Sequence, residues 1–278
     1  MWNRFRLPVP ETDTVYVQRK GKPMTSVIVT TSAFGADKVK SLGQHYFIPV
    51  VAQAGGSGIE IRREFFANPP YPLQELREML RQYPLITVYS APVPLWNSDG
   101  QLNVLDLPVI LEEGVTLGAQ YIKVSLGHYN PQQSDILQLK HLLEEFDLGH
   151  RGIQFTVEND QTPWGGTIEN LHRFFTSCRS HHVPVGMTFD IGNWHWTRSD
   201  RFEAAEKLKD SVVYVHCKHV ESLRGELHTV PLPSDPGEDW RALLFMFDKD
   251  IPRAIEFPIE GDNLTETAAG YIKLIAQV

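Results

Sequence analysis

Four residues whose side chains can do chemistry together lie at or near the ends of four successive apolar runs. They are Glu158, Asp190, His216 and Glu256. If the runs are parallel strands of one barrel, their carboxyl ends meet at one face, and the four side chains converge. Three carboxylates without a compensating cation would repel one another and raise each other's pKa, and a divalent metal removes that conflict. One nitrogen and several oxygens suit Mn²⁺, Mg²⁺, Co²⁺ or Fe²⁺, and zinc is also compatible.

Each of these residues also has a simpler interpretation when it is taken alone. Glu158 or Glu256 alone could be a salt-bridged barrel residue, and His216 alone could be a hydrogen-bonded core histidine. Asp190 alone could cap the loop that follows it. Their joint occurrence on four successive runs favours one metal site, with Glu158 and Glu256 as candidate catalytic groups.

A second set of polar residues lies near the same strand ends. Glu60 and Arg62 end the second run and share a face by the period of two. They could bind a substrate hydroxyl or carboxylate, or pair with each other. Lys218 follows His216 by two residues, and it could hold a substrate oxygen or neutralise Glu256. All three are predicted substrate-binding residues.

Tryptophans gather in the loops that follow the fifth and sixth runs. Trp164, Trp194 and Trp196 lie there, and flat rings suit the apolar face of a sugar. Loop aromatics also pack a lid without touching any ligand. Trp164 is retained as a candidate substrate contact.

The elements that must position these residues form eight strand–helix units. The apolar, β-branched runs predict strands over residues 26–31, 58–64, 85–92, 121–127, 152–159, 184–192, 212–220 and 254–259. Helical patterns follow over residues 36–46, 72–82, 104–118, 134–146, 167–180, 199–209, 238–247 and 264–276. Eight units spaced roughly thirty residues apart predict an α/β fold, a single-domain (β/α)₈ TIM barrel over residues 26–278. Residues 1–25 form a short N-terminal extension, which could fold as a hairpin over the bottom of the barrel.

Alternating strands and helices can also form an open, doubly wound sheet. Eight units, and the lack of a glycine-rich turn after the first strand, favour a closed barrel. The glycine cluster Gly55-Gly56-Ser57-Gly58 precedes a strand, so it is a turn and not a dinucleotide-binding loop.

Composition limits the partners. The 278 residues carry a net charge of −8 without a basic run, which argues against nucleic acid because phosphate neutralisation supplies most of that affinity. No apolar stretch is long enough to span a bilayer. Cys178 and Cys217 lack metal-site spacing and are expected as reduced thiols. A cytoplasmic location follows by default, and a homodimer stays open.

From residue 26 onward the sequence resembles the xylose-isomerase-like barrel superfamily, which includes sugar 3-epimerases, inosose dehydratases and hydroxypyruvate isomerases. The motifs that carry the resemblance are Val157-Glu158-Asn159, Gly165-Gly166-Thr167, Phe189-Asp190-Ile191-Gly192-Asn193, His216-Cys217-Lys218 and Pro236-Gly237-Glu238. The resemblance implies that Glu158, Asp190, His216 and Glu256 ligate one metal. It also implies that the two glutamates move a proton.

Two positions depart from the family pattern. Asn193 stands where members often have histidine, with His195 two residues further on, and His219 stands where many have aspartate. Asn193 can donate a hydrogen bond to a substrate hydroxyl, but it is a weaker proton donor than histidine. Both Asn193 and His195 are predicted substrate-binding residues.

These observations predict a metal-dependent isomerase or epimerase of a keto sugar or polyol, acting by proton abstraction next to a carbonyl. One alternative is an inosose-type dehydratase, and another is a sugar-binding barrel without turnover. The AP-endonuclease branch of the fold needs histidines near the second and third strands, where this chain has Glu60, Arg62 and Ser90-Ala91-Pro92, and it is disfavoured.

Overall fold

Eight parallel strands close into a barrel in a computed structural model that describes residues 25–278. Neighbouring strands follow the order β1-β10-β7-β6-β5-β4-β3-β2. The strands are β1 (Val27–Thr30), β2 (Gly58–Arg62), β3 (Ile86–Trp96), β4 (Tyr121–Gly127), β5 (Gln154–Glu158), β6 (Val185–Asp190), β7 (Val212–Cys217) and β10 (Arg253–Ile255). The closed parallel order confirms the predicted (β/α)₈ barrel.

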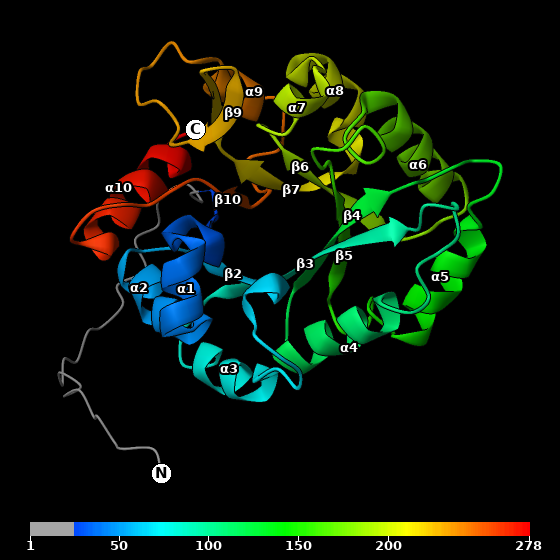
Figure 1. Cartoon of the computed structure of the whole chain (residues 1–278), viewed down its shortest axis with the longest axis horizontal. Coiled ribbons are helices and arrows are strands. Elements are labelled where there is room, and N and C mark those ends of the chain that lie inside the picture. The colour runs from blue at the N-terminus through cyan, green and yellow to red at the C-terminus, as the bar shows by residue number, and fades with distance from the viewer. Residues whose placement is uncertain (1–24) are drawn as a thin grey trace.

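Helices surround these strands (Figure 1). They are α1 (Ala36–Leu42), α2 (Phe47–Gln53), α3 (Leu73–Leu80), α4 (Leu107–Leu117), α5 (Ile136–Glu145), α6 (Ile168–Ser180), α7 (Trp194–Thr197), α8 (Arg201–Leu208), α9 (Asp239–Leu244) and α10 (Leu264–Ala276). Short 3₁₀ turns add η1 (Thr31–Phe34), η2 (Gln44–Tyr46), η3 (Arg63–Phe65) and η4 (Lys209–Ser211). Within residues 25–278, no helix is both long and apolar enough to cross a membrane.

The period of two gives each strand one apolar outer face and one inner face. Outer residues such as Val29, Ile59 and Val215 join the main hydrophobic core, which the surrounding helices complete. Ile28, Val88, Tyr214 and Ala254 form a separate small apolar cluster. Two residues further along their strands, the inner positions become polar, as at Glu60 after Gly58 and His216 after Tyr214. The barrel interior is therefore apolar at one level and charged at the next.

The first unit differs from the prediction of one helix over residues 36–46. Gly43 has φ 78° and its N–H bonds to the carbonyl of Val39, which ends α1. A side chain there would meet the His45 ring at 2.6 Å, so glycine is needed for the turn. The chain then starts a second helix, α2, which the sequence analysis did not predict.

The seventh unit also differs, because residues beyond the predicted strand over 212–220 form regular structure before the helix. The chain forms an antiparallel hairpin of β8 (His219–Leu223) and β9 (Glu226–Val230). Arg224 and Gly225 connect the strands, and both have positive φ, as a two-residue type I′ turn requires. The predicted strand over residues 212–220 is thus two strands. The predicted N-terminal hairpin lies outside the described residues.

Candidate metal centre

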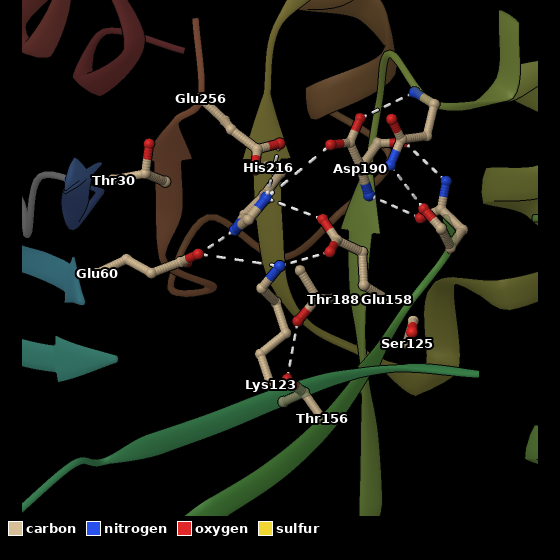
Figure 2. A network of polar contacts seen from close by, with 12 residues as sticks. Thr30, Glu60, Lys123, Ser125, Thr156, Glu158, Thr188, Asp190, His216 and Glu256 are labelled. Atoms are coloured by element: carbon tan, nitrogen blue, oxygen red, sulfur yellow. Dashed lines mark hydrogen bonds and ion pairs between the residues drawn. The ribbon is translucent and has the colours of Figure 1, made fainter. Parts of the chain in front are cut away.

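The four predicted ligand residues come together at the carboxyl end of the barrel. Glu158 and Asp190 are the last residues of β5 and β6, His216 is next to last in β7, and Glu256 directly follows β10. One ligand atom from each residue lies within 4.8 Å of the others (Figure 2). The register pairs Asp190 with His216 on adjacent strands. Barrel closure therefore converts four separated sequence positions into one cluster.

His216 is held so that its two ring nitrogens face different partners. Its Nε2 lies 2.9 Å from Glu60 Oε2. Its Nδ1 lies 3.0 Å from Glu158 Oε1 and 3.1 Å from Glu256 Oε2. Because an ionised carboxylate only accepts, Nε2–H donates to Glu60. Nδ1 is therefore the nitrogen that faces the cluster.

Asp190 is held in a similar way by the backbone of the loop that follows it. Its Oδ1 accepts hydrogen bonds from the N–H groups of Gly192 and Asn193 at 2.8 and 2.9 Å. Its Oδ2 points to the cluster, 3.9 Å from His216 Nδ1. The side chain is fully buried. One oxygen is thus held by the backbone, and the other faces the charged groups of the cluster.

Three cations surround the carboxylates. Arg62 Nη1 lies 2.8 Å from Glu256 Oε1, and Lys218 Nζ lies 3.0 Å from Glu256 Oε2 and 2.7 Å from Asp190 Oδ2. Lys123 Nζ forms an ion pair with Glu158 Oε2.

Glu60 adds a fourth carboxylate to this set, 3.2 Å from Arg62 and 3.8 Å from Lys123. Four negative and three positive groups leave one negative charge when His216 is neutral. A proton on His216, or another cation at the centre, balances that charge.

The negative charge of the carboxylates shifts the pKa values of the buried groups. Burial opposes the charged form of His216, but the charges of Glu256 and Glu60 raise its pKa well above the ordinary value of 6.5. Burial raises the pKa of Asp190 to about 7, partly offset by Lys218 and reinforced by Glu256. Both groups bind a proton more tightly than usual, as expected where several carboxylates lie close together.

Two buried polar atoms support a metal in this place. Among residues 25–278, Asp190 Oδ2 and His216 Nδ1 are buried, and neither makes a hydrogen bond of regular geometry. Their close neighbours are the charged groups of the cluster itself, Lys218 for Oδ2 and the two glutamates for Nδ1. Both atoms face the same point as Glu158 Oε1 and Glu256 Oε2. One imidazole nitrogen and three carboxylate oxygens fit a divalent ion.

The predicted substrate-binding residues Glu60, Arg62 and Lys218 all adjoin this cluster. Glu60 is fully buried, and its Oε2 also accepts a hydrogen bond from Tyr214 at 2.9 Å. Arg62 bridges Glu60 and Glu256, so the predicted pairing of Glu60 with Arg62 is present. Lys218 neutralises Glu256, as one of its two predicted roles requires.

Asn193 and His195 occupy different environments. Asn193 is buried, its side-chain N–H donates to the carbonyl of Asn159 at 2.8 Å, and its Oδ1 accepts from Gln161. His195 is exposed, with Nδ1 3.0 Å from the carbonyl of Gly192. The Asn193 side chain therefore braces two loops, while His195 remains accessible.

The loop tryptophans Trp194 and Trp164 also differ in their exposure to solvent. Trp194 is fully buried and packs against Phe189, with ring centroids 5.3 Å apart. It is a packing residue, the simpler of its two interpretations. Trp164 is exposed and stacks on His128. It lines a cavity to which none of the four ligand residues contributes.

Two residues of the cluster were missed from the sequence, Lys123 and Tyr214. Lys123 is only 3% exposed in the middle of β4, and Tyr214 is fully buried in β7. A lysine inside an otherwise apolar strand is a usable signal, because a buried charge needs a partner. Its parity places it on the inner face together with Ser125.

Comparison with known proteins agrees with the barrel fold. The sequence profile described as Xylose isomerase-like TIM barrel matches residues 48–273. No curated protein matches the chain in sequence.

Several solved structures are similar to this chain. Their sequence identity is low, so the similarity shows the fold alone. A xylose isomerase domain containing protein from Salmonella typhimurium LT2 is 16% identical, over 92% of this chain and 97% of that one, with a TM-score of 0.67. An L-ribulose 3-epimerase is 16% identical over 91% and 95%, with a TM-score of 0.60. An IOLI protein with a bound zinc atom is 17% identical over 91% and 95%, also with a TM-score of 0.60.

Proposed function

Because the chain belongs to the xylose isomerase-like TIM barrel family, we propose that it is a metal-dependent isomerase or epimerase of a keto sugar or polyol. The observation that carries the proposal is the convergence of Glu158, Asp190, His216 and Glu256 on one point. The similar L-ribulose 3-epimerase and the zinc-bound IOLI protein support this class of reaction and of cofactor.

The ligand atoms would be Glu158 Oε1, Asp190 Oδ2, His216 Nδ1 and Glu256 Oε2. With mixed nitrogen and oxygen ligands, the site suits Mn²⁺, Mg²⁺, Co²⁺ or Fe²⁺, and zinc is also compatible. When bound, such an ion polarises a substrate carbonyl and acidifies the neighbouring C–H.

Glu158 and Glu256 are the groups proposed to move the proton. The side chains of both are 14% exposed, whereas those of Asp190 and His216 are fully buried. A substrate therefore reaches the two glutamates first.

Burial would raise both pKa values, but Lys123 lowers that of Glu158, and Lys218 lowers that of Glu256. Both are thus ionised at neutral pH and able to accept a proton. One glutamate removes the proton, and the other, at the end of a different strand, returns it.

The cations hold these glutamates in place. Lys123 pairs with one oxygen of Glu158, and Arg62 with one oxygen of Glu256. Each pairing fixes the carboxylate so that its other oxygen faces the centre. We assign substrate oxygens to Arg62, Lys218 and His195, and support of the site to Glu60 and Asn193. Glu60 acts through His216, and Asn193 through the loop of Asp190.

Hydrogen–deuterium exchange at the carbon next to the carbonyl tests this function. Ketoses incubated in D₂O with enzyme and Mn²⁺ should incorporate deuterium, and a chelator should abolish the exchange. Glu256→Gln should lower the exchange rate by several orders of magnitude. The matched control is Glu203→Gln, on the outside of the barrel in α8.

Three other outcomes of the same experiment are informative. Loss of water from the ketose would assign a dehydratase. Ketose binding without exchange would assign a sugar-binding barrel. Rapid exchange in a metal-free sample, or in both Glu158→Gln and Glu256→Gln, would remove these glutamates from the mechanism.

A further inference from the structure

A cavity of about 1170 Å³ lies apart from the metal centre. Residues of the β3–α4, β4–α5 and β5–α6 loops and of helix α6 line it. Neither the four ligand residues nor the cations Arg62, Lys123 and Lys218 contribute to its lining. We call it the side pocket, and the lining residues that matter below are His128, Asn130, Gln133, Trp164 and Arg173.

The side pocket contains an aromatic platform. Trp164 stacks on His128, with ring centroids 4.6 Å apart and planes at 26°. Trp164 remains 52% exposed, although a large apolar ring normally gains free energy from burial. The stack therefore leaves part of the indole open to a ligand.

The loop that carries Trp164 is tightly folded. Asn170 donates to the carbonyl of Trp164 at 3.0 Å. A Cβ at Gly165 would lie 2.3 Å from Asp160 Oδ2, and a Cβ at Gly166 would lie 2.0 Å from the Asp160 carbonyl. The close approach of Asp160 accounts for the glycine pair, and the Asn170 bond fixes the Trp164 backbone, which lowers the entropy cost of binding a ligand.

The polar groups around the platform are mainly amides and hydroxyls. Asn130 Nδ2 donates to Gln133 Oε1 at 3.1 Å, and Asn130 Oδ1 accepts from the backbone N–H of Gln132 at 3.0 Å. The Gln133 amide N–H groups are left able to donate to a ligand. Arg173 Nε is paired with Glu169 at 2.7 Å, so its charge is partly neutralised. None of the lining residues is acidic.

We propose that the side pocket binds a neutral saccharide ring, independently of the metal centre. The C–H face of a sugar ring stacks on an indole, and its hydroxyls both donate and accept, as the amides do. The volume is sufficient for one or two rings, since ligand pockets typically measure about 300–1,000 Å³. An anion is disfavoured because Glu169 already shares the charge of Arg173. The proposal does not depend on the reaction at the metal centre.

Binding of cellobiose and methyl β-D-glucopyranoside to the full chain tests the proposal. Calorimetry and saturation-transfer NMR should detect binding that is equal with added Mn²⁺ and with chelator. Trp164→Ala should weaken cellobiose binding about tenfold, a loss equivalent to ~1.4 kcal/mol, while Trp164→Phe should retain part of it. The matched control is Trp196→Ala, a partly buried tryptophan outside the pocket, which should bind normally.

Circular dichroism checks that the variants fold, and Gln133→Ala replaces Trp164→Ala if the latter does not. Three results would overturn the proposal: no binding at millimolar cellobiose, binding that disappears with chelator, or cellobiose displaced by inorganic phosphate. The second would place the sugar at the metal centre, and the third would indicate an anion site. None of these readouts measures turnover, so failure here is distinguishable from failure of the proposed isomerase.

Discussion

Glu60 Oε2 lies 2.9 Å from His216 Nε2, although the two residues are 156 positions apart in the chain. This contact spans the barrel from β2 to β7 and points His216 Nδ1 at the carboxylates. A carboxylate that accepts from the second nitrogen of a metal-binding histidine fixes its tautomer and raises its basicity. The relationship makes Glu60 a positioning residue for the proposed metal site.

Glu60→Gln should therefore weaken metal binding about 10- to 100-fold, because Gln no longer carries the charge that orients His216. The variant should also be less stable, since Arg62 and Lys123 lose a buried partner. Tyr214→Phe removes only the hydroxyl that bonds to the same oxygen, and it should retain most of the metal affinity. Equal affinity in wild type and Glu60→Gln, measured by chelator competition, would contradict the assignment.

Asp190→Asn should lower metal content while the fold is retained. The remaining Oδ1 can still accept from the N–H groups of Gly192 and Asn193, but an amide nitrogen replaces the ligand oxygen. Removing a buried carboxylate can also raise the melting temperature of the metal-free protein. Elemental analysis checks the stoichiometry. Asp200→Asn, in the cap of α8, is the control and should bind metal normally.

Lys218→Met should increase metal affinity, by about tenfold or more, because a positive charge 2.7 Å from Asp190 Oδ2 opposes a second cation there. The same change should lower turnover if Lys218 holds a substrate oxygen. Lys207→Met, on an exposed face of α8, is the matched control. Weaker metal binding in Lys218→Met would show that the lysine supports the site and does not compete with the ion.

The metal-free protein should be less stable at pH 8 than at pH 6. Burial raises the pKa of Asp190 to about 7, and Glu256 and Glu60 raise that of His216 above 6.5 against the effect of burial. The folded state thus binds these protons more tightly than the unfolded chain, so stability falls as the pH rises through this window. The lowered pKa values of Glu60 and Glu256 change the stability only below pH 4.5, so they do not affect the difference between pH 6 and pH 8.

Urea unfolding with chelator at both pH values measures this effect, and saturating Mn²⁺ should reduce it. Asp190→Asn should show a smaller difference between pH 6 and pH 8. A wild-type midpoint that rises from pH 6 to pH 8 would show that other groups control the stability.

Asn193→Ala should mainly lower stability, whereas His195→Ala should mainly lower turnover. The Asn193 side chain is buried and bonded to Asn159 and Gln161, so its loss should lower the free energy of unfolding by about 1–3 kcal/mol. His195 is exposed, and its replacement should change stability by less than about 0.5 kcal/mol but lower turnover more. The reverse ranking in turnover and denaturation would make Asn193 the substrate contact.

The sequence alone predicted all eight strands of the barrel and the four metal-ligand candidates, because both depend on local patterns. The period of two and the recurring helix after each strand are local, and the active side of such barrels is always the carboxyl end of the strands. Glu158, Asp190 and His216 were identified in that way. Helix α2 and the β8–β9 hairpin were missed, since turns at Gly43 and at Arg224-Gly225 redirect the chain within single residues.

Only the tertiary structure decided which atoms face one another. Lys123 reaches Glu158, and Tyr214 reaches Glu60, through contacts across or between strands that no sequence spacing encodes. The same is true of Trp164, which lies in the side pocket away from the predicted ligand cluster. These positions depend on barrel closure and on loop packing. Closure brings residues more than 150 positions apart within 3 Å, and the period of a strand specifies a face but not the partner across it.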